Sequence, residues 1–200
     1  MKKNRLMGLL LLLLSMPAAV WAQWSYGLRL GVNFSTMKWK PIDPKFKVGT
    51  QLGAFATYNF TNTWSMQAEL LYELNGCRME LVHSEEGLHS EKEEIYKRNQ
   101  HYLSLPILAR YQFHTGVHLE LGLQFSYMLQ SKGIFKGDHF ALSGYKPWDV
   151  GLVIGAGYAF NDHLDFGFRY VHGFLSTTDY AADDFKAKNR NIQVNLGYRF

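Results

Sequence analysis

The chain ends with the stretch Ile192-Gln-Val-Asn-Leu-Gly-Tyr-Arg-Phe200, in which apolar and polar side chains alternate without a break. Successive side chains of a β-strand point to opposite faces, so the alternation predicts a strand with one apolar and one polar face. The apolar face is aliphatic and ends in two aromatic rings, Tyr198 and Phe200. Such a face is typical of a strand that borders lipid.

The closing Tyr-x-Phe recurs at residues 58–60, 111–113 and 158–160, each time at the end of an alternating run and just before turn residues. Four strands are therefore expected to end alike. Together with the runs between them, the alternation predicts eight strands. They lie at about residues 26–35, 50–60, 64–75, 101–113, 117–130, 148–160, 164–174 and 191–200.

The predicted strands are joined alternately by three-residue connections and by connections of about eleven residues or more. The longest of these, roughly residues 76–100, is rich in glutamate and is expected to be a solvated loop. Short periplasmic turns that alternate with long extracellular loops are typical of outer-membrane barrels. Lipid leaves unpaired backbone groups unsatisfied, so a strand-built span must close. We therefore predict an all-β fold, an eight-stranded antiparallel transmembrane up-and-down β-barrel.

Residues 1–22 have the features of a secretory signal: three basic residues near the start, a leucine run at residues 9–14, and small residues before Ala22. The apolar run is too short for a transmembrane helix, which needs about 20 residues. We thus expect a signal peptide at residues 1–22 and an outer-membrane barrel domain at residues 23–200.

Removal of the signal leaves 18 of the 21 basic residues against 17 acidic ones, a net charge of +1. A charge so near zero argues against a nucleic-acid partner. The single cysteine, Cys77, excludes an internal disulfide in an exported chain.

The strand ends on either side of the three-residue turns carry aromatic residues on the predicted outward face. At one level of the barrel they would form the girdle that marks a membrane interface. The predicted girdle and assembly signal comprises Tyr58, Phe60, Trp64, Tyr111, Phe113, Tyr158, Phe160, Tyr198 and Phe200.

The predicted inward face carries nine charged residues of nearly balanced sign. They are Arg29, Glu69, Glu73, Arg110, Glu120, Asp149, Asp165, Arg169 and Arg199. A charged binding site or an ion path is one interpretation. The favoured one is a salt-bridged plug, because the interior of an eight-stranded barrel is just wide enough for side chains to fill.

Three-residue turns pair outward residues with outward ones, so Arg110 should face Glu120, and Arg169 should face Gly155. Pro106 has no amide hydrogen for the ladder, and a bulge or local break is expected there.

The eight histidines are scattered and show no ligand spacing, and the glutamate-rich segment lacks a calcium-loop pattern, so neither a metal nor another cofactor is expected. A lipid-modifying enzyme is the main alternative class, with His172 as its base and Ser176 four residues on. Those two residues would lie about 13 Å apart on a strand. We therefore predict that the chain is not an enzyme. A soluble lipocalin-like barrel would explain neither the terminal Phe200 nor the alternating connections.

Four stretches together resemble the PorT-like family of Gram-negative outer-membrane β-barrel proteins. They are Tyr26-Gly-Leu-Arg-Leu-Gly-Val-Asn-Phe-Ser35, Gln67-Ala-Glu-Leu-Leu-Tyr72, Tyr102-Leu-Ser-Leu-Pro-Ile-Leu108 and Gly197-Tyr-Arg-Phe200. The resemblance covers essentially the whole chain after the signal. It implies the eight-stranded outer-membrane fold, and the family's name-giving member belongs to a protein secretion machinery.

From the fold and this resemblance, we expect an integral outer-membrane protein with a structural or interaction role through extracellular loops. An accessory role in a secretion complex is a further hypothesis, and a narrow porin-like channel is an alternative to it. The expected partners are outer-membrane lipid, the barrel-insertion machinery, which would read Phe200, and a protein bound by the loops.

Overall fold

The computed structural model describes residues 23–38, 45–83, 92–135, 138–141, 146–175 and 188–200. Its strands are β1 (Trp24–Lys38), β2 (Lys45–Asn59), β3 (Trp64–His83), β4 (Lys92–Gln112), β5 (Val117–Phe135), β6 (Asp138–Ala141), β7 (Trp148–Ala159), β8 (Leu164–Gly173) and β9 (Lys188–Arg199). No helix among these residues is long and apolar enough to cross a membrane.

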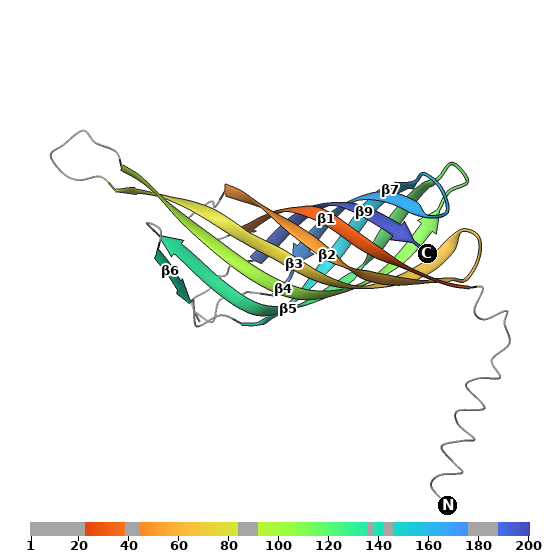
Figure 1. The fold of residues 1–200 in the computed structure, drawn as a ribbon, viewed down its shortest axis with the longest axis horizontal. Coiled ribbons are helices and arrows are strands. Elements are labelled where there is room, and N and C mark those ends of the chain that lie inside the picture. Colours follow the sequence, from red (N-terminus) through yellow and green to blue (C-terminus); the bar gives the residue numbers. More distant parts are fainter. Residues whose placement is uncertain (1–22, 39–44, 84–91, 136–137, 142–145, 176–187) are drawn as a thin grey trace, which may run out of the picture.

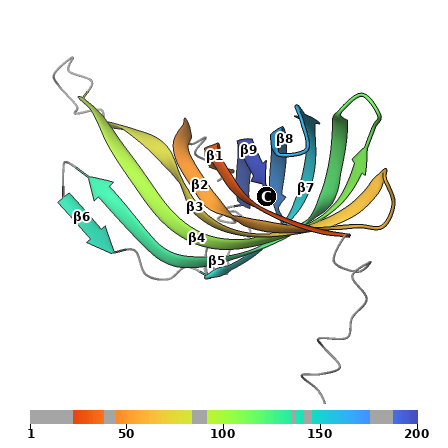
Figure 2. The same ribbon diagram turned by 45° about the vertical axis from the view of Figure 1, so that its right-hand side comes forward.

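Eight strands form one closed antiparallel barrel. Their order is β4-β3-β2-β1-β9-β8-β7-β5, and β4 also pairs with β5, which closes the ring (Figures 1 and 2). The short β6 pairs with the end of β5 outside the ring. The predicted fold class is confirmed, with β6 as an addition that alternation did not reveal.

Three tight turns and the C-terminus lie at one end of the barrel (Figure 1). At each turn the backbone NH of the last aromatic residue donates to the carbonyl of the residue four positions on; for Phe60 and Trp64 the distance is 3.0 Å. The side chains of Thr61 and Asn161 stabilise two of the turns by accepting backbone NH groups, as in ST- and Asx-turns. The register that follows places Arg110 opposite Glu120, as predicted.

At the other end, several strands are longer than their alternating sequence suggests. β3 and β4 continue as a paired ribbon from Gly76 and Asn99 to His83 and Lys92, so the expectation of a loop was wrong for residues 76–83 and 92–100, and residues 84–91 lie outside the described part of the chain. Two strands that pair with each other satisfy their backbone groups without a buried apolar face. Such a ribbon therefore carries no alternation signal.

Pro106 interrupts the pairing of β4 with β3 only locally, and the register is the same on both sides, at Ile107 and Ser104. The bulge lies instead between β4 and β5, at His101 and Tyr102. The structure therefore has the local break expected at Pro106, and the bulge at His101 and Tyr102 is a separate feature that was not predicted.

The distribution of side chains is reversed relative to a water-soluble protein. Large apolar residues such as Leu30 and Leu121 are about half exposed on the outside, whereas the largest fully buried side chains are Arg29, Arg110 and Arg169. A polar interior behind an apolar outer band is the arrangement of a transmembrane barrel.

Candidate functional site

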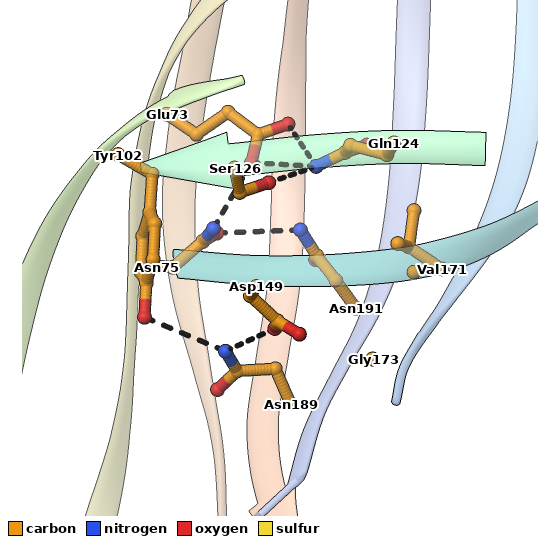
Figure 3. A pocket seen from close by; sticks show the side chains of 11 residues that line it. Glu73, Asn75, Tyr102, Gln124, Ser126, Asp149, Val171, Gly173, Asn189 and Asn191 are labelled. Carbon is orange, nitrogen blue, oxygen red and sulfur yellow. Dashed lines mark hydrogen bonds between the residues drawn. The ribbon is translucent and has the colours of Figure 1, made fainter. Parts of the chain in front are cut away.

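The lumen holds two separate groups of polar side chains. The group farther from the tight turns surrounds a small cavity, which we call the chamber (Figure 3). Its volume is about 30 Å³. It is lined by Glu73, Asn75, Tyr102, Gln124, Ser126, Asp149, Gly151, Val171, Gly173, Asn189 and Asn191.

Glu73 is fully buried on one side of the chamber and is held by neutral donors. Ser104 Oγ donates to it at 3.0 Å, Gln193 Nε2 at 3.0 Å and Asn75 Nδ2 at 3.1 Å. Gln124 Nε2 lies 3.3 Å from one of its oxygens. Within the described part of the chain, this carboxylate has hydrogen bonds but no ion pair.

Asp149 lies on the other side of the chamber, at the start of β7. Its Oδ2 accepts a hydrogen bond from Asn189 Nδ2 at 2.8 Å, and Asn189 also reaches the Tyr102 hydroxyl at 3.4 Å. Gly173 on β8 leaves room for the carboxylate of Asp149, since a Cβ there would lie 2.8 Å from Oδ2. The two carboxylates of the chamber thus come from opposite parts of the wall.

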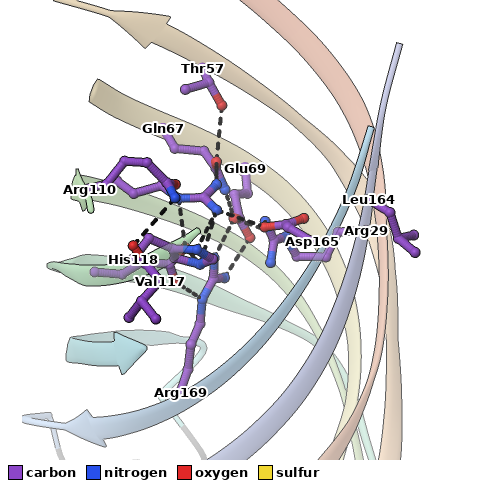
Figure 4. Close-up of polar contacts among 12 residues, drawn as sticks. Arg29, Thr57, Gln67, Glu69, Arg110, Val117, His118, Leu164, Asp165 and Arg169 are labelled. Atoms are coloured by element: carbon purple, nitrogen blue, oxygen red, sulfur yellow. Dashed lines mark hydrogen bonds and ion pairs between the residues drawn. The ribbon is translucent and has the colours of Figure 1, made fainter. Parts of the chain in front are cut away.

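The second group lies nearer the tight turns, and we call it the ion-paired cluster: Arg29, Glu69, Arg110, Glu120, Asp165 and Arg169. Figure 4 shows all of them labelled except Glu120. At its centre Arg169 is bidentate to Glu69, at 2.7 and 2.8 Å, and its Nε lies 2.6 Å from Glu120. Two parallel bonds to one carboxylate fix both geometry and charge.

The other two arginines complete the cluster. Arg110 contacts Asp165 at 2.9 Å and Glu120 at 3.8 Å. Arg29 lies 3.1 Å from Glu69 and 3.6 Å from Asp165, and its guanidinium is 5.2 Å from the ring centre of Phe55. Three positive and three negative side chains therefore neutralise one another and connect β1, β3, β4, β5 and β8 across the lumen.

The ion-paired cluster also includes three residues that we did not assign to it from the sequence. His118 places its ring nitrogens 2.9 and 3.0 Å from Arg110 Nη2. Arg110 Nη1 donates to Gln67 at 3.1 Å, and Gln67 accepts from Thr57 at 3.0 Å. The alternation of the sequence places each of the three side chains on the inward face of its strand. It does not indicate their partners, which lie on other strands.

Glycine and small apolar residues shape the remaining space. Arg169 pairs with Gly155 as predicted, and a Cβ on Gly155 would lie 2.9 Å from Arg169 Cγ, so the arginine fills the room beside that glycine. Leu108, Val153 and Val171 form a buried apolar patch on the inner wall. The ion-paired cluster therefore fills its section of the lumen with packed side chains.

The nine charged residues do not form one network. Six belong to the ion-paired cluster, and Glu73 and Asp149 line the chamber. Arg199 is half-buried at the mouth near the tight turns. Among the described residues, no acidic side chain forms an ion pair with it.

The nine aromatic residues of the predicted girdle all flank the tight turns or the C-terminus. Their rings form edge-on pairs, among them Trp64 with Tyr111 at 4.9 Å between centroids and Tyr158 with Phe160 at 5.2 Å. Phe200 is 71% exposed, and its backbone NH donates to the carbonyl of Tyr26 at 2.9 Å. The terminal ring therefore sits on the outer surface while its backbone closes the barrel.

The residues considered for an enzyme or a metal site lie as follows. His172 contacts the Tyr170 hydroxyl at 3.3 Å, whereas Ser176 lies outside the described residues. Across the described ranges, no three or more His, Cys, Asp or Glu side chains gather in a way that could hold a metal ion.

Comparison with known proteins agrees with the barrel. The chain resembles Neisserial surface protein A, with 10% identity, a TM-score of 0.58, and coverage of 88% of this chain and 97% of the other. Ail of Yersinia pestis has 16% identity and a TM-score of 0.46, and the match covers 89% of this chain and 99% of Ail. OprG of Pseudomonas aeruginosa has 16% identity and a TM-score of 0.45, and the match covers 88% of this chain and 95% of OprG. The likeness to Neisserial surface protein A shows the fold alone.

A search of curated protein sequences found no match. The sequence profile of a family described as outer membrane protein beta-barrel domain, however, matches residues 18–179. That match covers most of the chain and agrees with the closed eight-stranded barrel, its apolar outer face and its polar lumen. This chain is a small outer-membrane β-barrel protein and belongs to the outer membrane protein beta-barrel domain family.

Proposed function

We propose that this protein is a closed scaffold in the outer membrane that presents its extracellular strands to a protein partner, and that it is neither a pore nor an enzyme. The observation that carries the proposal is the ion-paired cluster, in which the guanidinium groups of Arg29, Arg110 and Arg169 are buried against carboxylates. An open pathway would leave such charges in water.

The strand lengths support the role of the extracellular side. β3 has 20 residues. At about 3.3 Å per residue and a tilt of roughly 40°, it rises about 50 Å along the barrel axis. The apolar band of such barrels is only about 25 Å tall. The β3–β4 ribbon therefore projects well beyond the membrane, where it can reach another protein.

Export and assembly follow from the same proposal. Residues 1–22 act as the signal, residues 23–200 form the barrel, and Phe200 is read by the insertion machinery. An accessory role in a protein secretion complex is supported by the resemblance to the PorT-like family. Deletion of Phe200 is expected to lower the folded fraction, measured by the heat-dependent gel shift of intact barrels; equal folding would contradict this part.

Two measurements test the scaffold. In planar-bilayer recordings the wild type should show no steady conductance, whereas Arg169→Ala should open a measurable one and the lipid-facing control Leu121→Ala should not. A large, steady conductance from the wild type would overturn the proposal and favour a narrow channel.

The partner is sought by cross-linking in intact cells, followed by extraction in mild detergent. A variant with residues 78–97 replaced by a short turn should lose the cross-linked partner. The control His114→Ala, exposed at the opposite mouth, should keep it. Partners unchanged by removal of the ribbon would contradict its role.

A further inference from the structure

We propose that the chamber binds a single hard cation with the charge and size of Ca²⁺. The inference goes beyond the scaffold function, and it departs from the expectation that the chain holds no metal. The chamber's volume of about 30 Å³ suits one ion or one water molecule and excludes larger organic ligands.

The first argument is charge. Glu73 and Asp149 are 1% and 7% exposed, and none of the described residues that line the chamber is a lysine, an arginine or a histidine. The three arginines of the ion-paired cluster are matched by its own three acids. Arg98, on the same strand as Tyr102, directs its Nε to Ser131 Oγ at 3.1 Å. A buried negative charge is costly unless it is paired, so two such charges favour a bound cation.

The second argument is a set of oxygen atoms without partners. Among the described residues, Gln124 Oε1 and Asn191 Oδ1 have no hydrogen-bond donor, although each residue is more than nine-tenths buried. Asp149 Oδ1 has no side-chain donor there, while the backbone NH groups of Val150 and Leu175 lie near its carboxylate. Buried polar atoms in native proteins are nearly always satisfied. All three atoms are acceptors on residues that line the chamber, so the missing partner is a cation or a donor and not an anion.

The orientation of the two amides is set by their nitrogens. Asn191 Nδ2 donates to Asn75 Oδ1 at 3.3 Å, and Gln124 Nε2 donates to Ser126 Oγ at 3.1 Å as well as to Glu73 (Figure 3). Because the nitrogens are engaged with acceptors, the amide oxygens remain available for a ligand.

The third argument is ligand chemistry. The polar atoms around the chamber are carboxylate, amide and hydroxyl groups, with neither thiol nor imidazole, and these oxygen ligands suit hard cations. Ca²⁺ accepts six to eight oxygens in flexible geometry, whereas Mg²⁺ demands an octahedron and retains several waters, for which the chamber is too small. Two carboxylates also balance a divalent charge.

Isothermal titration of the refolded chain with CaCl₂, in a neutral detergent free of lipopolysaccharide, tests the proposal. The wild type should show saturable one-site binding that NaCl does not reproduce. Asp149→Asn should weaken it by roughly tenfold or more, because one charged ligand is lost. The matched control Asp162→Asn, exposed at the opposite mouth, should bind like the wild type.

The heat-dependent gel shift verifies that each variant is folded. If Asp149→Asn does not fold, Asn191→Ala removes one oxygen without a change of charge and should also weaken binding. Absence of saturable calcium binding by the wild type, as for a chamber that holds only water, would overturn the proposal. Equal affinity in the wild type and the chamber variants, or saturation by Na⁺ alone, would overturn it as well.

Discussion

The ion-paired cluster and the chamber occupy the same lumen but accommodate buried charge in different ways. In the cluster, every carboxylate has an arginine within ion-pair distance. In the chamber, Glu73 and Asp149 are surrounded by neutral amides and hydroxyls, and several oxygens lack partners. The comparison teaches that acidic and basic side chains can neutralise one another and close one layer of a barrel interior. A neighbouring layer, in which the acids have no such partners, can keep room for an ion from solution.

Removal of Arg169 should have the largest effect, because it leaves Glu69 and Glu120 with less compensation in a buried site. Arg169→Ala is expected to lower the free energy of unfolding by about 3–5 kcal/mol, as for other broken buried ion pairs. Urea unfolding in detergent measures it. Asn189→Ala in the chamber loses one hydrogen bond to the Asp149 carboxylate and a longer one to the Tyr102 hydroxyl, and should cost about 1.5–3 kcal/mol. Equal losses would remove the distinction between the two regions.

The same substitution in both regions sharpens the comparison. Asp165→Asn removes a charge that contacts Arg110 and Arg29, and should cost roughly 2–3 kcal/mol. Asp149→Asn keeps the bond from Asn189 and removes a buried charge that has no ion pair among the described residues, so in calcium-free buffer its effect should be within about 0.5 kcal/mol of zero or stabilising. A larger loss for Asp149→Asn than for Asp165→Asn would reverse our interpretation.

Two glycines compare how tightly side chains pack in the two regions. A Cβ on Gly157 would lie 2.3 Å from the Phe166 carbonyl and 2.4 Å from His118, so Gly157→Ala should cost about 1–3 kcal/mol through overpacking. A Cβ on Gly173 meets Asp149 Oδ2 at 2.8 Å, the end of a side chain that can shift, so Gly173→Ala should cost less than about 1 kcal/mol. Thermal unfolding midpoints compare them, and the opposite order would show that the chamber is the more rigid layer.

The barrel and its register could be predicted because they depend on local patterns. Alternation with period two identified the eight strands, and three-residue turns placed Arg110 opposite Glu120. The ribbon at residues 76–83 and 92–99 could not be predicted, since the pairing of two backbones does not require alternation in their sequences. Nothing in the sequence indicated the bulge at His101 and Tyr102. The break at Pro106 could be predicted, because proline has no amide hydrogen.

By itself, the sequence determined which face of each strand is polar and which strands are neighbours, because side-chain direction and short turns are properties of adjacent residues. Only the tertiary structure decided which inward charges meet. Arg169 and Glu69 are 100 residues apart and lie on β8 and β3, which are not paired with each other. Their contact depends on the tilt and stagger with which the barrel closes, and these are properties of the whole ring. The same closure separated Glu73 and Asp149 from the arginines and left them around a chamber of their own.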